Sequence, residues 1–289
     1  MCELWILIQE NVVINLDAGK FYLRFYLLLN IFILGKLLFR LVVSLVKNSL
    51  QYKLWKNMKK IFSILFILFL FHFGHAQTID TLIDVGGYKL HFNILKGKGV
   101  PILFESGNGD DATVWKDLLK SIYDLTGATL ITYDRAGLGL SGIDTLRINI
   151  SNEVKSLEIG LYKLGFSKNI FVVSHSFGSY YSTLFTLKNR KKVKGIVFID
   201  VLTPCYFTKQ RARETKESVS KEDWLMIKKE APGLYYVLNN LETIYDYTKD
   251  KQIPTNIPLT IIGADIPPQI VKETERDEWK NCLKAFGEL

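Results

Sequence analysis

Residues 170–178 read Ile-Phe-Val-Val-Ser-His-Ser-Phe-Gly, an apolar stretch that leads to a serine with small residues two positions before and two positions after it. This pattern predicts a buried strand that ends in a sharp turn and continues as a helix. A serine in such a turn stands clear of the sheet, where its hydroxyl can reach a substrate carbonyl. Ser174 and Gly178 are small enough for strand and helix to approach closely, although the usual pattern has glycine at both positions. Ser176 is therefore the candidate nucleophile.

A second turn supplies candidate groups for an oxyanion hole. Gly107-Asn108-Gly109 follows a short apolar strand over Pro101–Glu105. A turn of this kind offers a backbone N–H to a developing oxyanion, and we assign that donor to Asn108. The second N–H would come from Phe177, directly after the nucleophile and at the start of a helix. The glycines alone would indicate only a turn, so the assignment depends on where the turn lies relative to Ser176.

The rest of the chain from residue 77 alternates strands and helices. This order predicts an α/β fold with a mostly parallel sheet and helices on both faces. Residues 201–256 interrupt the alternation with charged helical segments, and we expect this insertion to lie over the strand ends. The expected elements are a hairpin of Thr81–Val85 and Tyr88–Leu95, strands at Thr129–Tyr133, Val193–Ile199 and Pro258–Ile262, and helices at Asp110–Tyr123, Asn152–Leu164, Phe177–Leu187 and Ile270–Phe286.

Three blocks in this order resemble the α/β-hydrolase fold superfamily, and within it the serine hydrolases with a helical cap. The blocks are Glu-Ser-Gly-Asn-Gly at 105–109, Tyr-Asp-Arg-Ala-Gly-Leu-Gly-Leu-Ser-Gly at 133–142 and Val-Ser-His-Ser-Phe-Gly at 173–178. The resemblance covers about residues 80–287. In the family the segment 134–142 braces the turn beside the active site, so Asp134 and Arg135 are not assigned catalytic roles.

The resemblance implies an α/β-hydrolase core in residues 77–289 with a helical cap at about 201–256. It also implies hydrolysis of an ester, amide or related acyl bond of a small molecule through an acyl-Ser176 intermediate, with no metal and no cofactor. Serine at the nucleophile position argues against dehalogenase and epoxide-hydrolase chemistry.

The acid of the expected catalytic triad has two candidates. The family's order is serine, then acid, then histidine. Asp265, which follows the strand Pro258–Ile262, matches the usual acid position, and Asp200 at the end of Val193–Ile199 is the alternative. Either residue could instead only cap or solvate a strand end.

The histidine has no candidate. His72 and His75 precede the globular part, His91 lies in an early strand, and the side chain of His175 is expected to point away from Ser176. In the family the histidine follows one more strand beyond the last helix. We therefore expect the last strand, the histidine loop and the closing helix to be missing from this chain, through truncation or a frameshift of an ordinary hydrolase. The alternative is a short non-catalytic relative that serves as an exported binding module.

The N-terminal residues predict export. Residues 58–76 combine a basic start, an apolar run and small residues at the end, as in a secretory signal peptide. We expect translation to start naturally at Met58 and residues 1–57 not to be native. The apolar stretch 21–46 is a poor membrane span because charges interrupt it. The protein is then periplasmic or secreted, and a membrane anchor remains only if residues 1–76 are retained.

The charge distribution argues against nucleic acid as a partner, and the cysteines bear on whether the protein is exported. Of the formal charge of +8, residues 1–76 carry nine basic and three acidic side chains, a net of +6. The remaining +2 gives no basic face for nucleic acid. Cys205 and Cys282 could form one disulfide in an exported protein or stay as two buried thiols.

Overall fold

The computed structural model describes residues 55, 57–58, 77–264 and 271–288. The predicted signal peptide after residue 58, nearly all of 1–57, and Asp265 lie outside this part of the chain. None of the described helices has the length and apolar character needed to cross a bilayer.

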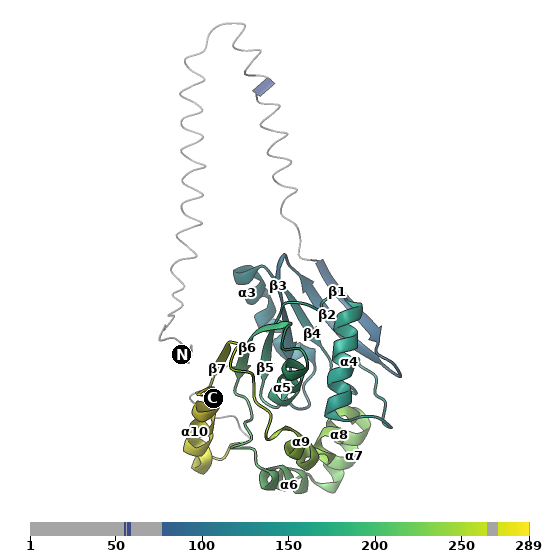
Figure 1. Ribbon diagram of the computed structural model, residues 1–289. Helices are drawn as coiled ribbons and strands as arrows, with labels where there is room; N and C mark the ends of the chain where they lie inside the picture. The colour runs from purple at the N-terminus through teal and green to yellow at the C-terminus, as the bar shows by residue number, and fades with distance from the viewer. Residues whose placement is uncertain (1–54, 56, 59–76, 265–270, 289) are drawn as a thin grey trace. The chain divides into compact units, whose positions relative to one another are not determined.

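The described strands form a single sheet in the order β1-β2-β4-β3-β5-β6-β7 (Figure 1). β1 pairs antiparallel with β2 and β2 antiparallel with β4, whereas all the other pairs are parallel. The predicted hairpin and the mostly parallel sheet are thereby confirmed. The strands are β1 (Gln77–Asp84), β2 (Lys89–Lys96), β3 (Gly99–Glu105), β4 (Ala128–Tyr133), β5 (Ile170–His175), β6 (Val193–Ile199) and β7 (Leu259–Ile262).

Helices cover both faces of this sheet. On one face α4, α5 and α10 pack in a core with Phe92, Leu103 and Phe198, and on the other α3 packs near Phe104 and Leu130. The described α-helices are α3 (Lys116–Thr126), α4 (Ile150–Lys163), α5 (Gly178–Lys188), α6 (Lys209–Glu217), α7 (Lys221–Glu230), α8 (Pro232–Asn239), α9 (Leu241–Thr248) and α10 (Arg276–Gly287).

The helix expected from Asp110 begins later than the sequence predicted. Asp111 has an extended backbone, and its carboxylate accepts the N–H of Thr113, which starts a 3-10 turn at 112–115. Trp115 closes that turn with its ring 5.1 Å from the ring of Phe104. The helical spacing of apolar residues was correct, but the side-chain cap at Asp111 delayed the α-helix to Lys116.

The helices α6–α9 are inserted between β6 and β7 and lie together at one end of the sheet (Figure 1). Gly233, at the start of α8, donates its N–H to the carbonyl of Gly137 at 3.0 Å. A Cβ on Gly109 would lie 3.2 Å from Leu234. Gly109 lies in the loop after β3 and Gly137 in the loop after β4. The inserted helices therefore cover the carboxyl ends of these two strands.

A disulfide joins Cys205, in the loop after β6, to Cys282 on α10, with 5.6 Å between the Cα atoms. Of the two states that the sequence left open, the structure therefore has the bonded one. The bond ties the start of the inserted segment to the last described helix.

Candidate functional site

Ser176 occupies the turn between β5 and α5 with φ of 51°, in the left-handed region. For a residue with a Cβ this conformation costs about 1–3 kcal/mol, so the surroundings must hold it. The N–H of Ser176 donates to the carbonyl of Ile199 at 3.0 Å, and its carbonyl accepts from Ser179 at 3.1 Å. The turn is thus fixed on β6 at one side and on α5 at the other, and it presents Ser176 at the carboxyl end of a central strand.

The small residues beside Ser176 allow the predicted close approach. A Cβ on Gly178 would lie 2.5 Å from the carbonyl oxygen of Ser106 and 2.9 Å from Cγ of Glu105. Ser174 is completely buried, and among the described residues its hydroxyl has no hydrogen-bond partner. The departure from glycine at 174 therefore fits sterically, with one buried hydroxyl left unpaired.

The turn after β3 lies against the Ser176 turn. Glu105 of β3 pairs with Ser174 of β5, and a Cβ on Gly107 would lie 2.9 Å from Nδ1 of His175. The two predicted oxyanion donors, the N–H groups of Asn108 and Phe177, have no hydrogen-bond acceptor within the described part of the chain. Both groups are therefore free to bind an external acceptor, as an oxyanion hole requires.

A buried ion pair supports the turn after β3. Nη1 of Arg135 lies 2.7 Å from Oε1 of Glu105 and donates to the carbonyl of Ser106 at 2.6 Å, while Nη2 donates to the carbonyl of Gly107. Burial alone would lower the pKa of Arg135, but the Glu105 carboxylate raises it above its usual value. Arg135 is charged at any ordinary pH and fixes the carbonyls on one side of the turn, which orients the amide of Asn108.

Of the two candidate acids, the structure describes Asp200. Asp200 follows β6 with φ of 46°, and its Oδ1 accepts the N–H of Ala264 at 2.6 Å. Its own N–H donates to the carbonyl of Ile262 at the end of β7. Asp200 thus acts as a brace between the exits of β6 and β7. Asp265, the preferred candidate, lies outside the described residues and stays a prediction.

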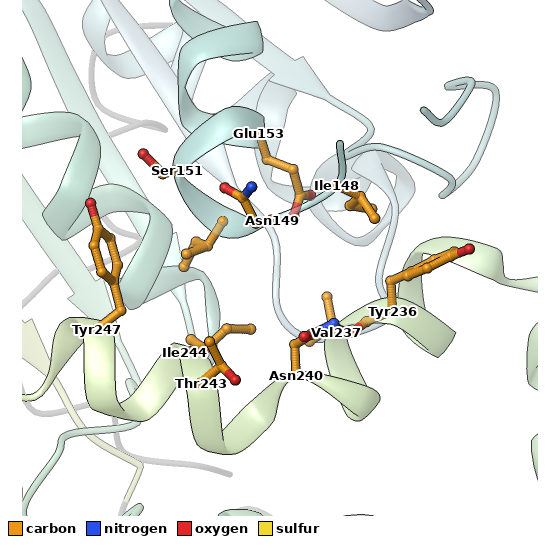
Figure 2. Close-up of a pocket in the computed structure, with 11 residues that line it drawn as sticks. Ile148, Asn149, Ser151, Glu153, Tyr236, Val237, Asn240, Thr243, Ile244 and Tyr247 are labelled. Atoms are coloured by element: carbon orange, nitrogen blue, oxygen red, sulfur yellow. Dashed lines mark hydrogen bonds between the residues drawn. The ribbon is translucent and has the colours of Figure 1, made fainter. Parts of the chain in front are cut away.

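A cavity of about 210 Å³ lies between the first turn of α4 and the helices α8 and α9 (Figure 2). Ser176 is not among the residues that line it. Glu153 on α4 is its only charged lining residue. The lining of this cavity is therefore separate from Ser176.

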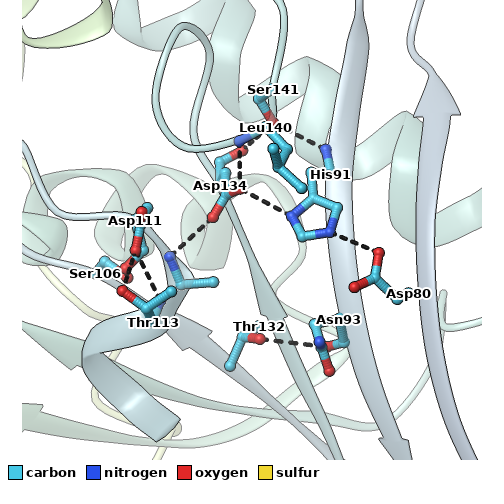
Figure 3. A network of polar contacts seen from close by, with 11 residues as sticks. Asp80, His91, Asn93, Ser106, Asp111, Thr113, Thr132, Asp134, Leu140 and Ser141 are labelled. Carbon is cyan, nitrogen blue, oxygen red and sulfur yellow. Dashed lines mark hydrogen bonds and ion pairs between the residues drawn. The ribbon is translucent and has the colours of Figure 1, made fainter. Parts of the chain in front are cut away.

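The described histidines do not supply a base. His91, on β2, lies between two carboxylates, with Nδ1 2.8 Å from Oδ2 of Asp134 and Nε2 2.9 Å from Oδ1 of Asp80 (Figure 3). The ring of His175 stands edge-on to Trp115 at 6.5 Å between centroids. Among the described residues, neither imidazole forms a hydrogen bond with Ser176.

Asp134 is structural, as the resemblance implied. Its Oδ1 accepts the N–H of Ala112 at 2.8 Å, and its Oδ2 accepts the N–H of Leu140 at 2.9 Å in addition to the contact with His91. One carboxylate thereby ties the loop after β4 to the start of the 3-10 turn and to β2 (Figure 3).

Sequence reasoning missed two buried carboxylates. Glu105 closes a strand, and its pairing with Arg135 could have been suspected from two opposite charges beside predicted strand ends. Glu153 lies on the buried face of α4, three residues after Ile150 and one before Val154. In the sequence, Glu153 is a charged residue that interrupts the apolar face of the predicted helix.

Comparison with known proteins agrees with this architecture. The model of the alpha/beta hydrolase fold family matches residues 100–222, which run from β3 into α7 and include the Ser176 turn. A curated relative, the "Uncharacterized protein YqjL" of Bacillus subtilis (strain 168), is 36% identical over 117 residues. The match covers 40% of this chain and 46% of that protein, so it spans about half of the relative's length.

Solved structures with a similar fold include enzymes of several kinds. An esterase from Thermogutta terrifontis, solved with malate bound, has 23% identity and a TM-score of 0.42, over 61% of this chain and 68% of that chain. The haloalkane dehalogenase DatA from Agrobacterium tumefaciens C58 has 15% identity and a TM-score of 0.46, over 73% of this chain and 96% of that chain.

Proposed function

This chain has the α/β-hydrolase fold, and the model of that family matches its residues 100–222; from that premise we propose that it is a serine hydrolase of ester, amide or related acyl bonds. The observation that carries the proposal is the strained turn at Ser176, held at φ of 51° beside two backbone N–H groups with no acceptor among the described residues. Strain of this kind persists where the surroundings enforce it, as at a nucleophile presented above a sheet.

In the proposed reaction Oγ of Ser176 attacks the carbonyl carbon of a small-molecule acyl substrate. The N–H groups of Phe177 and Asn108 stabilise the oxyanion, and the leaving group departs to give an acyl-Ser176 ester, which water then hydrolyses. Asp265 is the proposed acid, with Asp200 as the alternative. The mechanism needs neither a metal nor a cofactor.

A general base must take the proton of Ser176, and the described residues place no imidazole there. Sites of this type that lack one member of the triad keep a residual acceleration of about 10³–10⁴-fold over water from the oxyanion hole and substrate binding. We therefore propose that the turn is assembled for catalysis and that its full rate requires an imidazole beside Ser176.

Added imidazole tests this proposal. The rate of hydrolysis of a p-nitrophenyl ester would be measured against imidazole concentration for the wild-type chain, Ser176→Ala and Ser174→Ala. We expect an imidazole-dependent rate above the buffer reaction for the wild type and Ser174→Ala, and none for Ser176→Ala. Equal rates for all three proteins would remove the serine-hydrolase proposal and leave a non-catalytic binding protein.

We also propose that the protein is exported through residues 58–76. The Cys205–Cys282 disulfide supports this, because disulfides persist in oxidising compartments. The nearly balanced charge of residues 77–289 supports a small-molecule substrate over nucleic acid as the partner.

A further inference from the structure

The cavity between α4 and the inserted helices has mostly apolar walls. Figure 2 shows the side chains from α8 and α9 facing those from the start of α4 across the space. Its volume of about 210 Å³ is below the roughly 300 Å³ at which pockets for drug-sized ligands begin. The cavity therefore fits a molecule of about the size of a substituted benzene ring. The apolar lining residues are Ile148, Ile150, Val237 and Ile244.

Glu153 is the single charged residue in that lining, and it is 9% exposed. Its Oε1 accepts the hydroxyl of Tyr181 at 3.1 Å. Within the described residues no cation forms an ion pair with this carboxyl, since the buried Arg135 pairs with Glu105 instead. A buried carboxyl with one neutral donor is under-satisfied, and a bound ligand with an N–H group would supply what is missing.

We propose that this cavity is a binding site for a small apolar molecule that carries an ammonium group, with Glu153 as the counter-ion. The hydrocarbon part packs against the isoleucines and the valine, and the ammonium donates to the carboxylate. The site is independent of the acyl chemistry proposed at Ser176.

The other lining residues agree with a cation. Tyr236 and Tyr247 contribute aromatic rings, whose faces attract cations. The N-terminus of α4 favours an anion there, and Glu153 in the first turn already supplies that anion. When Glu153 is ionised, the ligand thus meets a negative charge in a lining that holds no other charged residue.

Protonation of Glu153 competes with the ligand. Burial raises the pKa of Glu153 to about 7, with Arg135 opposing the shift. The ionised form binds the ammonium, so binding must weaken as pH falls through 7. The titratable or charged groups that interact with Glu153 or share one of the two cavities that it lines are Glu105, Tyr133, Arg135, Tyr181, Tyr88, Asp144, Arg147, Lys155, Tyr236 and Tyr247.

Two probes test the proposal on the full chain: benzylammonium, and benzyl alcohol, which has the same shape without the charge. Their binding is measured by calorimetry or ligand-observed NMR. At pH 8 we expect the ammonium to bind at least about tenfold more tightly than the alcohol, as a hydrogen bond to a charged group predicts. In Glu153→Gln this preference should vanish while binding of the alcohol stays within about twofold. For the wild type, binding of the ammonium should be roughly tenfold weaker at pH 6 than at pH 8.

Two further variants control the interpretation. Ile244→Trp fills the cavity and should abolish binding of both probes, with circular dichroism to establish that the variant is folded. Ser176→Ala should bind both probes like the wild type, which separates this site from the proposed hydrolase. An equal affinity of wild type and Glu153→Gln for benzylammonium, or no saturable binding by the wild type, would overturn the proposal.

Discussion

Arg135 and Glu105 form an ion pair that is almost completely buried, with Nη1 2.7 Å from Oε1 and side chains 2% and 1% exposed. The same guanidinium holds the carbonyls of Ser106 and Gly107. The pair therefore stabilises the sheet and fixes the turn that carries one oxyanion donor.

Replacing Arg135 by methionine should be strongly destabilising. It leaves the Glu105 carboxylate buried without its cation, and breaking such a pair costs about 3–5 kcal/mol. Arg147 offers a matched control, because it pairs with Asp144 at 2.6 Å while its own side chain is 67% exposed. We expect Arg147→Met to cost less than about 1 kcal/mol. Urea unfolding of both variants measures the contrast, and similar losses would contradict the role given to Arg135.

Gly178→Ala tests the close packing of α5 against β3. The new methyl group would lie 2.5 Å from the carbonyl oxygen of Ser106, so backbone must shift, and overpacking of this kind costs about 1–3 kcal/mol. At Gly142 a Cβ has its nearest neighbour at an ordinary 3.4 Å. The midpoint of thermal unfolding should fall for Gly178→Ala and change little for Gly142→Ala; a reversed order would show that the approach at 178 is looser than described.

His91 should make the stability depend on pH. Burial alone would lower its pKa, but hydrogen bonds to the carboxylates of Asp80 and Asp134 raise it above the ordinary value. Because the pKa of His91 is higher in the folded than in the unfolded state, its protonation stabilises the fold. This stabilisation is complete below the unfolded pKa of about 6.5 and is lost as pH rises through the folded pKa.

The measurement is the free energy of unfolding of the wild type and His91→Gln from pH 5.5 to 8.5. The difference between the two proteins isolates the imidazole, because the other titrating groups are shared. We expect the free energy of unfolding of the wild type to exceed that of His91→Gln by less and less as pH rises. An advantage that grows with pH would mean that His91 is neutral between the two carboxylates.

The Cys205–Cys282 bond should contribute substantially to stability. Cross-links of this kind typically contribute about 2–4 kcal/mol, and this one spans a sequence separation of 77 residues. Dithiothreitol should lower the unfolding midpoint of the wild type to that of Cys205→Ala/Cys282→Ala, and it should leave the double variant unchanged. A wild-type midpoint that does not respond to the reductant, in a protein shown by thiol titration to be reduced, would contradict this.

The fold could be predicted from sequence because its signals are local. The apolar runs that became β3, β5 and β6 each end at a turn residue, and the small residues around Ser176 predicted the strand–helix junction. The start of α3 was predicted too early, at Asp110 instead of Lys116, because a single carboxylate, that of Asp111, caps a 3-10 turn before the α-helix.

The candidate site was less predictable because its supports are long-range. Glu105 and Arg135 are 30 residues apart, and only the pairing of β3 with β4 brings them together. The same holds for Asp200, whose hydrogen bond to Ala264 joins two strand exits that are distant in sequence. Glu153 could be seen to interrupt an apolar helix face, but its cavity exists only where α8 and α9 fold back over α4.

The central claim is that Ser176 is placed to act as a nucleophile, and covalent modification tests it most directly. The chain would be incubated with a fluorophosphonate probe, with and without imidazole, and the adduct mapped by mass spectrometry. We expect the phosphonyl group on Ser176, formed faster with imidazole, absent from Ser176→Ala and retained in Ser174→Ala. A folded wild-type chain with no adduct at Ser176 under either condition would contradict the account.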